Sequence, residues 1–286
     1  MSLSETLLLG FIAGVTILIG LPVGRLRRPA PALRLVLNAT AVGVLLFLFW
    51  DVLSAAWEPV DAGLVAVHDG TGGLAPVLGF GLLFLGGLVV GLLALVGYDR
   101  YMSRAAAAAR GGPGAMAATE LQPTRLGVAA WSPAKQLALL IAIGIGLHNF
   151  AEGLAIGQAA ASSQIALATV LVIGFALHNA TEGFGIVAPL AGEAGGSTRP
   201  SWRFLLAMGA IGGGPTFVGT AVGHSFTSTP VSVVFLTLAA GSIVYVVAQL
   251  LGVAARAKRP DLLAYGLLLG LAAGFVTDAI VTAGGA

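Results

Sequence analysis

The sequence predicts an all-α polytopic membrane protein with eight transmembrane helices. Hydrophobic residues make up 57% of its 286 residues and charged residues only 9%, against a usual charged share of about 25% in soluble proteins. Apolar runs long enough to cross a bilayer recur along the chain. The runs are continuously apolar rather than alternating, which favours helices over a β-barrel. So few charges cannot cover a soluble surface, which excludes a soluble enzyme, a disordered protein and a nucleic-acid binder.

The apolar runs are separated by short breaks that contain Pro, Gly, Ser or charged residues. The one long connection, about 101–134, is rich in Ala, Gly and Pro, which is typical of a flexible linker. We expect a single transmembrane domain over residues 1–286, with spans at about 4–24, 33–57, 74–100, 135–158, 164–190, 201–226, 230–255 and 261–283.

The basic residues predict the orientation of the spans. All 14 Lys and Arg residues fall in or beside alternate connections, those after the first, third, fifth and seventh spans. Lys and Arg concentrate on the cytoplasmic side of membrane proteins. Eight spans then place both termini outside the cytoplasm, and the long loop inside it, in a multi-pass protein of the cell membrane. The N-terminus lacks the charge order of a signal peptide, since Glu5 is its only charge before the first apolar run.

A six-residue pattern occurs twice, near the middle of two of the apolar spans. Residues 148–153 read HNFAEG and residues 178–183 read HNATEG, thirty positions apart on the fourth and fifth spans. Residues four apart lie on one helix face, so each His shares a face with its Glu. The two spans run antiparallel, so the pattern predicts two imidazoles and two carboxylates together near mid-membrane, which is the usual setting of a transport site.

The chemistry of this set predicts a divalent transition metal as the ligand. Ionisable groups inside the bilayer are costly and mark function. Two neutral imidazoles and two carboxylates carry a charge of −2, and they suit Zn(II), Fe(II), Mn(II), Co(II) or Cd(II) better than Cu(I), Mg(II) or Ca(II). The chain has no cysteine, which excludes thiolate ligands. The neighbouring Asn amides would either join the site or bond an adjacent helix.

The two motifs, on spans four and five of eight, closely resemble the ZIP (Zrt/Irt-like) divalent metal transporters. The resemblance is sharp over about 135–190 and topological elsewhere. It implies a bundle of three, two and three helices with inverted symmetry between the outer triplets. By carry-over of the motif positions, it also implies a metal site lined by His148, Asn149, Glu152, His178, Asn179 and Glu182.

The sequence departs from the family pattern at three places. Thr181 replaces the proline of the second motif, so the fifth helix is expected to be straighter than in relatives. Gly214 precedes Pro215 where many members have glutamate, and Leu250 follows the seventh-span Tyr-Val-Val stretch where acidic residues are frequent. Both losses remove carboxylates that would complete a second metal position, so we expect one central metal.

Other polar residues have two interpretations each. Asp51 and Asp278, near the outer ends of their spans, would attract an incoming cation or simply reach water. Ser242, Tyr245 and Gln249 share a face of the seventh span and would line the pathway or bond across helices. An outer loop is expected to hold a group of residues that either collects metal or is merely solvated: Glu58, Asp61, His68 and Asp69.

The sequence therefore predicts a transporter that moves a divalent transition metal, Zn(II) or Fe(II) first, into the cytoplasm. The metal is the substrate, and no cofactor is expected. Two alternatives remain: an intramembrane metal-dependent hydrolase, with the HxxxE pairs holding a catalytic metal, and a proton or cation channel that uses the glutamates as a relay. Pairs of small residues such as Gly10/Gly14 predict close helix packing within one bundle, with a homodimer as the other use of such pairs.

Overall fold

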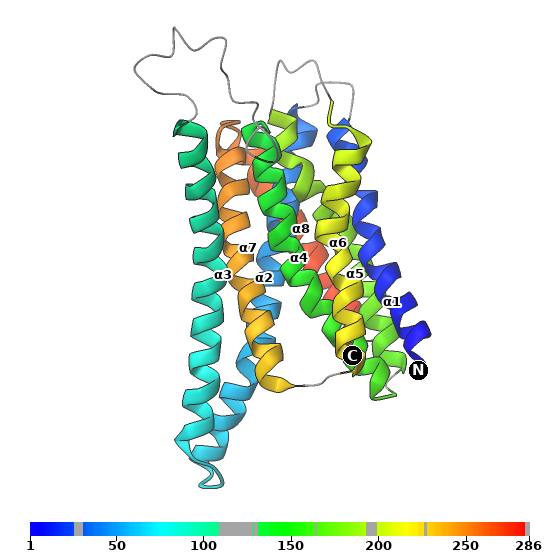
Figure 1. Ribbon diagram of the computed structural model, residues 1–286, viewed down its shortest axis with the longest axis vertical. Coiled ribbons are helices and arrows are strands. Elements are labelled where there is room, and N and C mark those ends of the chain that lie inside the picture. The colour runs from blue at the N-terminus through cyan, green and yellow to red at the C-terminus, as the bar shows by residue number, and fades with distance from the viewer. Residues whose placement is uncertain are drawn as a thin grey trace.

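The computed structural model describes residues 1–25, 31–108, 128, 131–163, 165–192, 199–225 and 228–283. Within this part of the chain, eight helices are long and apolar enough to cross a membrane, as predicted. Figure 1 shows them as one bundle of upright helices. The helices are α1 (Leu3–Val15), α2 (Pro31–His68), α3 (Leu74–Ala108), α4 (Pro133–Ala161), α5 (Ile165–Val187), α6 (Trp202–Ser225), α7 (Thr229–Ala255) and α8 (Pro260–Ala283).

The hairpin of α2 and α3 extends beyond the other helices at the lower end of Figure 1. The predicted outer loop after residue 57 is wrong in its first part, because α2 continues through Pro59 to His68. Packing explains the continuation: Trp57 meets Phe84 of α3 edge-on at 5.0 Å, and Val60 is buried. Glu58, Asp61 and His68 therefore lie on a helical extension, with Asp69 in the turn that follows it.

The long connection between α3 and α4 is shorter than expected. Residues 101–108 continue α3, as an alanine run with high helix propensity favours. At the other end, Ser132 accepts a hydrogen bond from the Lys135 amide and starts α4, with Pro133 in the first turn. Of the remaining residues of the expected flexible loop, 109–127 and 129–130 lie outside the described residues.

The first span changes from α-helix to 3₁₀ helix part-way along its length. After α1 the chain continues as two 3₁₀ segments, Thr16–Ile19 and Leu21–Arg25. Gly20 in this stretch lies against Gly183 of α5, where a Cβ on either glycine would meet the other helix's backbone. The tighter helix follows the surface of α5 at this close approach.

The helices pack as two groups of four. One group contains α1, α4, α5 and α6, with the most extensive contact between α4 and α6. The other contains α2, α3, α7 and α8, in which α2 packs on α8 and α3 packs on α7. The two groups meet mainly where α4 contacts α7 and where α5 contacts α2 and α8. The two motif helices thus belong to the same group.

Glycine allows close backbone contact within each group. A Cβ on Gly153 of α4 would collide with the Thr216 carbonyl of α6, and a Cβ on Gly43 of α2 would collide with the Leu267 carbonyl of α8. Between the groups, glycines face side chains instead: Gly144 faces Val246, and a Cβ on Gly185 would be in ordinary contact with Leu250. The helices of a group are therefore fixed to one another more tightly than the groups are.

Both ends of the chain lie toward the same end of the bundle. In Figure 1, α1 begins and α8 ends in the lower half, on the side of the α2–α3 turn. An even number of spans requires this arrangement.

Candidate metal site

The two motifs lie in the middle of α4 and α5, which form an antiparallel pair. The chain turns between them at Ser162 and Ser163, and Ser163 has a left-handed φ of 59°. Five motif residues are almost fully buried, at 0–5% exposure: His148, Asn149, Glu152, Asn179 and Glu182. His178 lies in α5, but its side chain is outside the described part of the structure.

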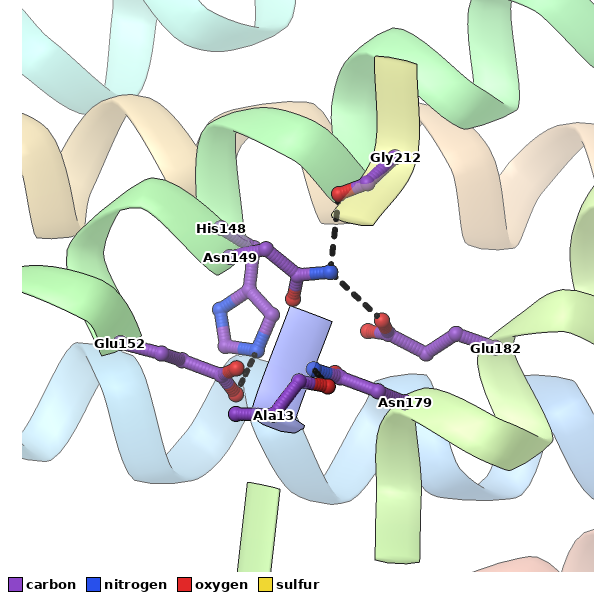
Figure 2. Close-up of polar contacts among 7 residues, drawn as sticks. All are labelled: Ala13, His148, Asn149, Glu152, Asn179, Glu182 and Gly212. Carbon is purple, nitrogen blue, oxygen red and sulfur yellow. Dashed lines mark hydrogen bonds and ion pairs between the residues drawn. The ribbon is translucent and has the colours of Figure 1, made fainter. Parts of the chain in front are cut away.

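His148 and Glu152 are in contact one turn apart on α4, as their spacing predicts, and form an ion pair when the imidazole is protonated. The His148 Nε2 atom lies 2.9 Å from Glu152 Oε1, and Figure 2 shows the imidazole turned toward the carboxylate. The pair is only 2% and 4% exposed. In a low-dielectric interior such a contact offsets part of the cost of burying the two groups.

Asn149 joins the two motifs. Its Nδ2 atom donates to Glu182 Oε2 at 3.2 Å and to the Gly212 carbonyl of α6 at 3.0 Å. Both bonds are drawn in Figure 2. The amide therefore orients the Glu182 carboxylate of α5 and fixes α6 to the site at the same time.

Asn179 has an equivalent role on the opposite side. Its Nδ2 atom donates to the Ala13 carbonyl of α1 at 3.1 Å. The first motif's Asn thus bonds α6 and the second motif's Asn bonds α1, as an inverted pairing of the two halves would require. Both amide nitrogens bond adjacent helices, which is one of the two roles that the sequence left open.

The amide oxygens of both asparagines have no hydrogen-bond partner within the described residues. These atoms are Asn149 Oδ1 and Asn179 Oδ1, and both are buried. Buried polar oxygens normally have a partner. Because each Nδ2 is held by a neighbouring helix, each Oδ1 is held in a fixed direction and is available to a ligand.

The described side chains do not form a ready metal cluster. Among them, no three His, Asp or Glu groups lie together in a way that could hold a metal ion. Glu152 is engaged by His148, and Glu182 by Asn149. The four-ligand site expected from the sequence includes His178, whose side chain is not described, so the arrangement of the full set stays a prediction.

The structure brings one further acidic residue close to the motifs. Asp51 of α2 is near enough to His148 to interact with it electrostatically. It comes from α2, which belongs to the other helix group. Asp278 is half-buried and lies near the end of α8.

The seventh-span residues make contacts within and across the groups. The buried Ser242 donates from Oγ to the Gly144 carbonyl of α4 at 3.1 Å. Gln249 Nε2 donates to the Tyr245 hydroxyl at 3.0 Å. Ser242 therefore bonds across helices, as one of the two interpretations expected.

The two positions that lack the family's carboxylates have different surroundings. Gly214 is exposed, and a Cβ there would meet nothing within 4 Å. The two glycines before it are buried: Gly212 faces Ile17 and Ile186, and Gly213 lies against Gly14. Leu250 is fully buried, and its carbonyl accepts a hydrogen bond from Asn38 at 3.1 Å.

Sequence reasoning missed the two backbone carbonyls that hold the asparagines. Ala13 and Gly212 contribute only main-chain atoms, which no side-chain pattern marks. The available signal was the concentration of glycine in the first and sixth spans, since Gly14 lies directly against Gly213. Helices that approach so closely expose their carbonyls to side chains of the neighbouring helices.

Comparison with known proteins agrees with the motifs. The ZIP zinc transporter family matches residues 117–251. Curated relatives named zinc transporter ZupT, from Escherichia coli K12 (DH10B) and from E. coli O157:H7 (EC4115), are 30% identical over 154 residues. That region is 54% of this chain and 49% of each relative, so the chain spans about half the length of the curated relatives it matches. The chain is thus related to the ZIP zinc transporters over its central part, as its two motifs indicated.

Proposed function

We propose that this chain carries a divalent transition-metal cation, Zn(II) or Fe(II) first, into the cytoplasm through a site between α4 and α5. The observation that carries the proposal is the burial of an imidazole and two carboxylates on facing helices half-way through the membrane. Such groups are costly at that depth unless they serve a function. The relatives named zinc transporters support a transport function over other uses of a buried metal.

The donor set suits a cation of borderline hardness. His148 supplies nitrogen, Glu152 and Glu182 supply carboxylate oxygen, and the unpartnered oxygens of Asn149 and Asn179 complete the shell. We propose His178 as the second nitrogen ligand. Carboxylates and imidazoles together match Zn(II) and Fe(II), and their charge balances one divalent ion.

A cation that reaches the site would compete with His148 for the Glu152 carboxylate and with the Asn149 amide for the Glu182 carboxylate. Release to the cytoplasm is the reverse step, and protonation of Glu152 or Glu182 would promote it by weakening both charge and ligation.

We propose that access alternates by displacement of one helix group against the other. The contacts support this, since backbones interlock at glycines within a group while side chains separate the groups. Asp51, in the other group, interacts electrostatically with His148. We propose that a cation entering from outside meets this carboxylate before it reaches Glu152.

Uptake into proteoliposomes with a trapped fluorescent chelator tests the proposal. The double variant His148→Ala/Glu182→Ala is compared with wild type for Zn(II), Fe(II), Mn(II), Cd(II) and Mg(II). The matched control is Arg259→Gln/Asp261→Asn, which removes an ion pair whose side chains are 56% and 46% exposed. We expect saturable uptake that only the motif variant loses.

The same experiment separates the alternatives. Non-saturating flux that is insensitive to the motif would indicate a channel. Metal binding without uptake, joined to turnover of a lipid or peptide, would indicate a hydrolase. We also propose that the protein lies in the cell membrane with both termini extracytoplasmic. This orientation is tested independently of metal uptake.

A further inference from the structure

A second feature lies at the level of the motifs but on a different face of α4. A groove of about 570 Å³ opens between α4, α6 and α7. Its lining is apolar and includes Leu147, Phe150, Gly214, Val218 and Phe235. His148 and Glu152 project from another face of α4. The groove is therefore separate from the candidate metal site.

The groove is hollow because small residues form its floor. Gly146 and Gly214 both line it, and a Cβ at Gly214 would meet nothing within 4 Å. One side is closed by an aromatic contact between Phe150 of α4 and Phe235 of α7, whose ring centroids are 4.6 Å apart. An open apolar volume of this size does not stay empty in a condensed medium.

The surroundings determine what fills it. Leu147 lies at the middle of α4, and Gly214 lies near the middle of α6, so the groove is within the hydrocarbon layer. No polar side chain lines it, so water would find few partners there. We propose that an acyl chain of a membrane lipid occupies this groove.

The groove joins the two helix groups. Leu147 and Val218 belong to α4 and α6 of the motif group, whereas Phe235 belongs to α7 of the other group. A displacement between the groups changes the width of the groove. The acyl chain therefore acts as a wedge between the two helix groups: it stabilises their present relative position, and it must move when the groups are displaced during transport. This consequence rests on the proposed function, whereas occupancy itself does not.

Tryptophan quenching tests occupancy directly. Phe235→Trp places an indole in the groove, and its fluorescence is compared in bilayers of brominated and unbrominated phosphatidylcholine, with the wild-type signal subtracted. We expect strong quenching. Adding Gly214→Leu should reduce it by at least half, because one volume cannot hold both the leucine and an acyl chain. The matched control is Gly86→Leu on α3, where a Cβ also meets nothing within 4 Å.

Two results would overturn the inference. Absent quenching would show that lipid does not enter the groove. Quenching that Gly214→Leu leaves unchanged would show that the indole meets only lipid outside it. Metal uptake adds a second readout: Gly214→Leu should slow uptake several-fold while Gly86→Leu does not. Equal uptake by both would refute the wedge, and absent uptake by wild type would refute the transport function while the quenching result still stood.

Discussion

Replacing Gly153 by alanine should loosen the contact between α4 and α6 that positions the first motif. Gly153 follows Glu152 directly and lies against the backbone of α6. An added methyl would collide with the Thr216 carbonyl oxygen and lie 2.8 Å from the Thr220 amide nitrogen. The colliding atoms are main chain, so no side-chain rotation relieves the overlap.

The magnitude follows from two opposing effects. Overpacking costs about 1–3 kcal/mol, and a rigid backbone partner favours the upper end. Alanine in place of glycine returns about 1 kcal/mol through helix propensity. We therefore expect Gly153→Ala to lower the free energy of unfolding by about 2 kcal/mol, or the apparent Tm by about 4–8 °C. Gly86→Ala, with open space around its Cβ, should be neutral or slightly stabilising.

The assay is reversible unfolding in mixed detergent micelles, followed by circular dichroism, with wild type and both variants in the same buffer. A Gly153→Ala protein as stable as Gly86→Ala would refute the close approach of α4 and α6. Metal uptake by Gly153→Ala should also fall, because Glu152 shifts with the helix. Normal uptake in a destabilised protein would separate the packing from the site.

Three further predictions address other contacts. Asn149→Leu should destabilise the protein by about 2–4 kcal/mol in the same unfolding assay. The reason is that the buried Glu182 carboxylate and the Gly212 carbonyl lose the donor that they share. Stability equal to that of wild type would contradict these two hydrogen bonds. Asn38→Leu should change stability by less than about 1 kcal/mol. It loses one hydrogen bond to the Leu250 carbonyl, but it also removes a buried Oδ1 atom that has no partner, and the two effects oppose each other. A loss of stability as large as that of Asn149→Leu would contradict this balance. The chain has no cysteine, so single cysteines at Gly72 and Lys258 should react with a membrane-impermeant maleimide from opposite sides, Gly72→Cys from outside the cell; labelling of both from one side would refute the topology.

The sequence predicts the number of spans because apolar length is a property of composition. Twenty or so apolar residues are needed to cross the bilayer, and the breaks between runs contain residues that water stabilises. The ends of α2 and α3 do not follow this rule. Their pairing near the connecting turn depends on contacts such as Trp57 with Phe84, which composition does not reveal. Pro59 suggests a break, but tertiary packing stabilises the helix across it.

One contact of the candidate site was predictable from the sequence, whereas its surroundings were not. The repeated spacing of His and Glu places His148 beside Glu152, and the structure has this pair at 2.9 Å. No pattern predicts that Asn149 reaches Glu182 on the opposite helix. That contact depends on the rotation of α4 relative to α5, which is set by glycine contacts with α1 and α6.

The way the motif groups satisfy one another bears on selectivity. A buried carboxylate without a partner is costly, and here each glutamate has one within the protein: an imidazole for Glu152 and an amide for Glu182. On the proposed function a cation has to replace these contacts, so we expect an ion that gains from nitrogen and carboxylate ligands together to bind best. Mg(II), which dehydrates reluctantly and prefers oxygen, gains least from that exchange. We therefore predict that Mg(II) in large excess does not inhibit uptake of Zn(II) or Fe(II), and inhibition by Mg(II) at concentrations similar to theirs would contradict this reasoning.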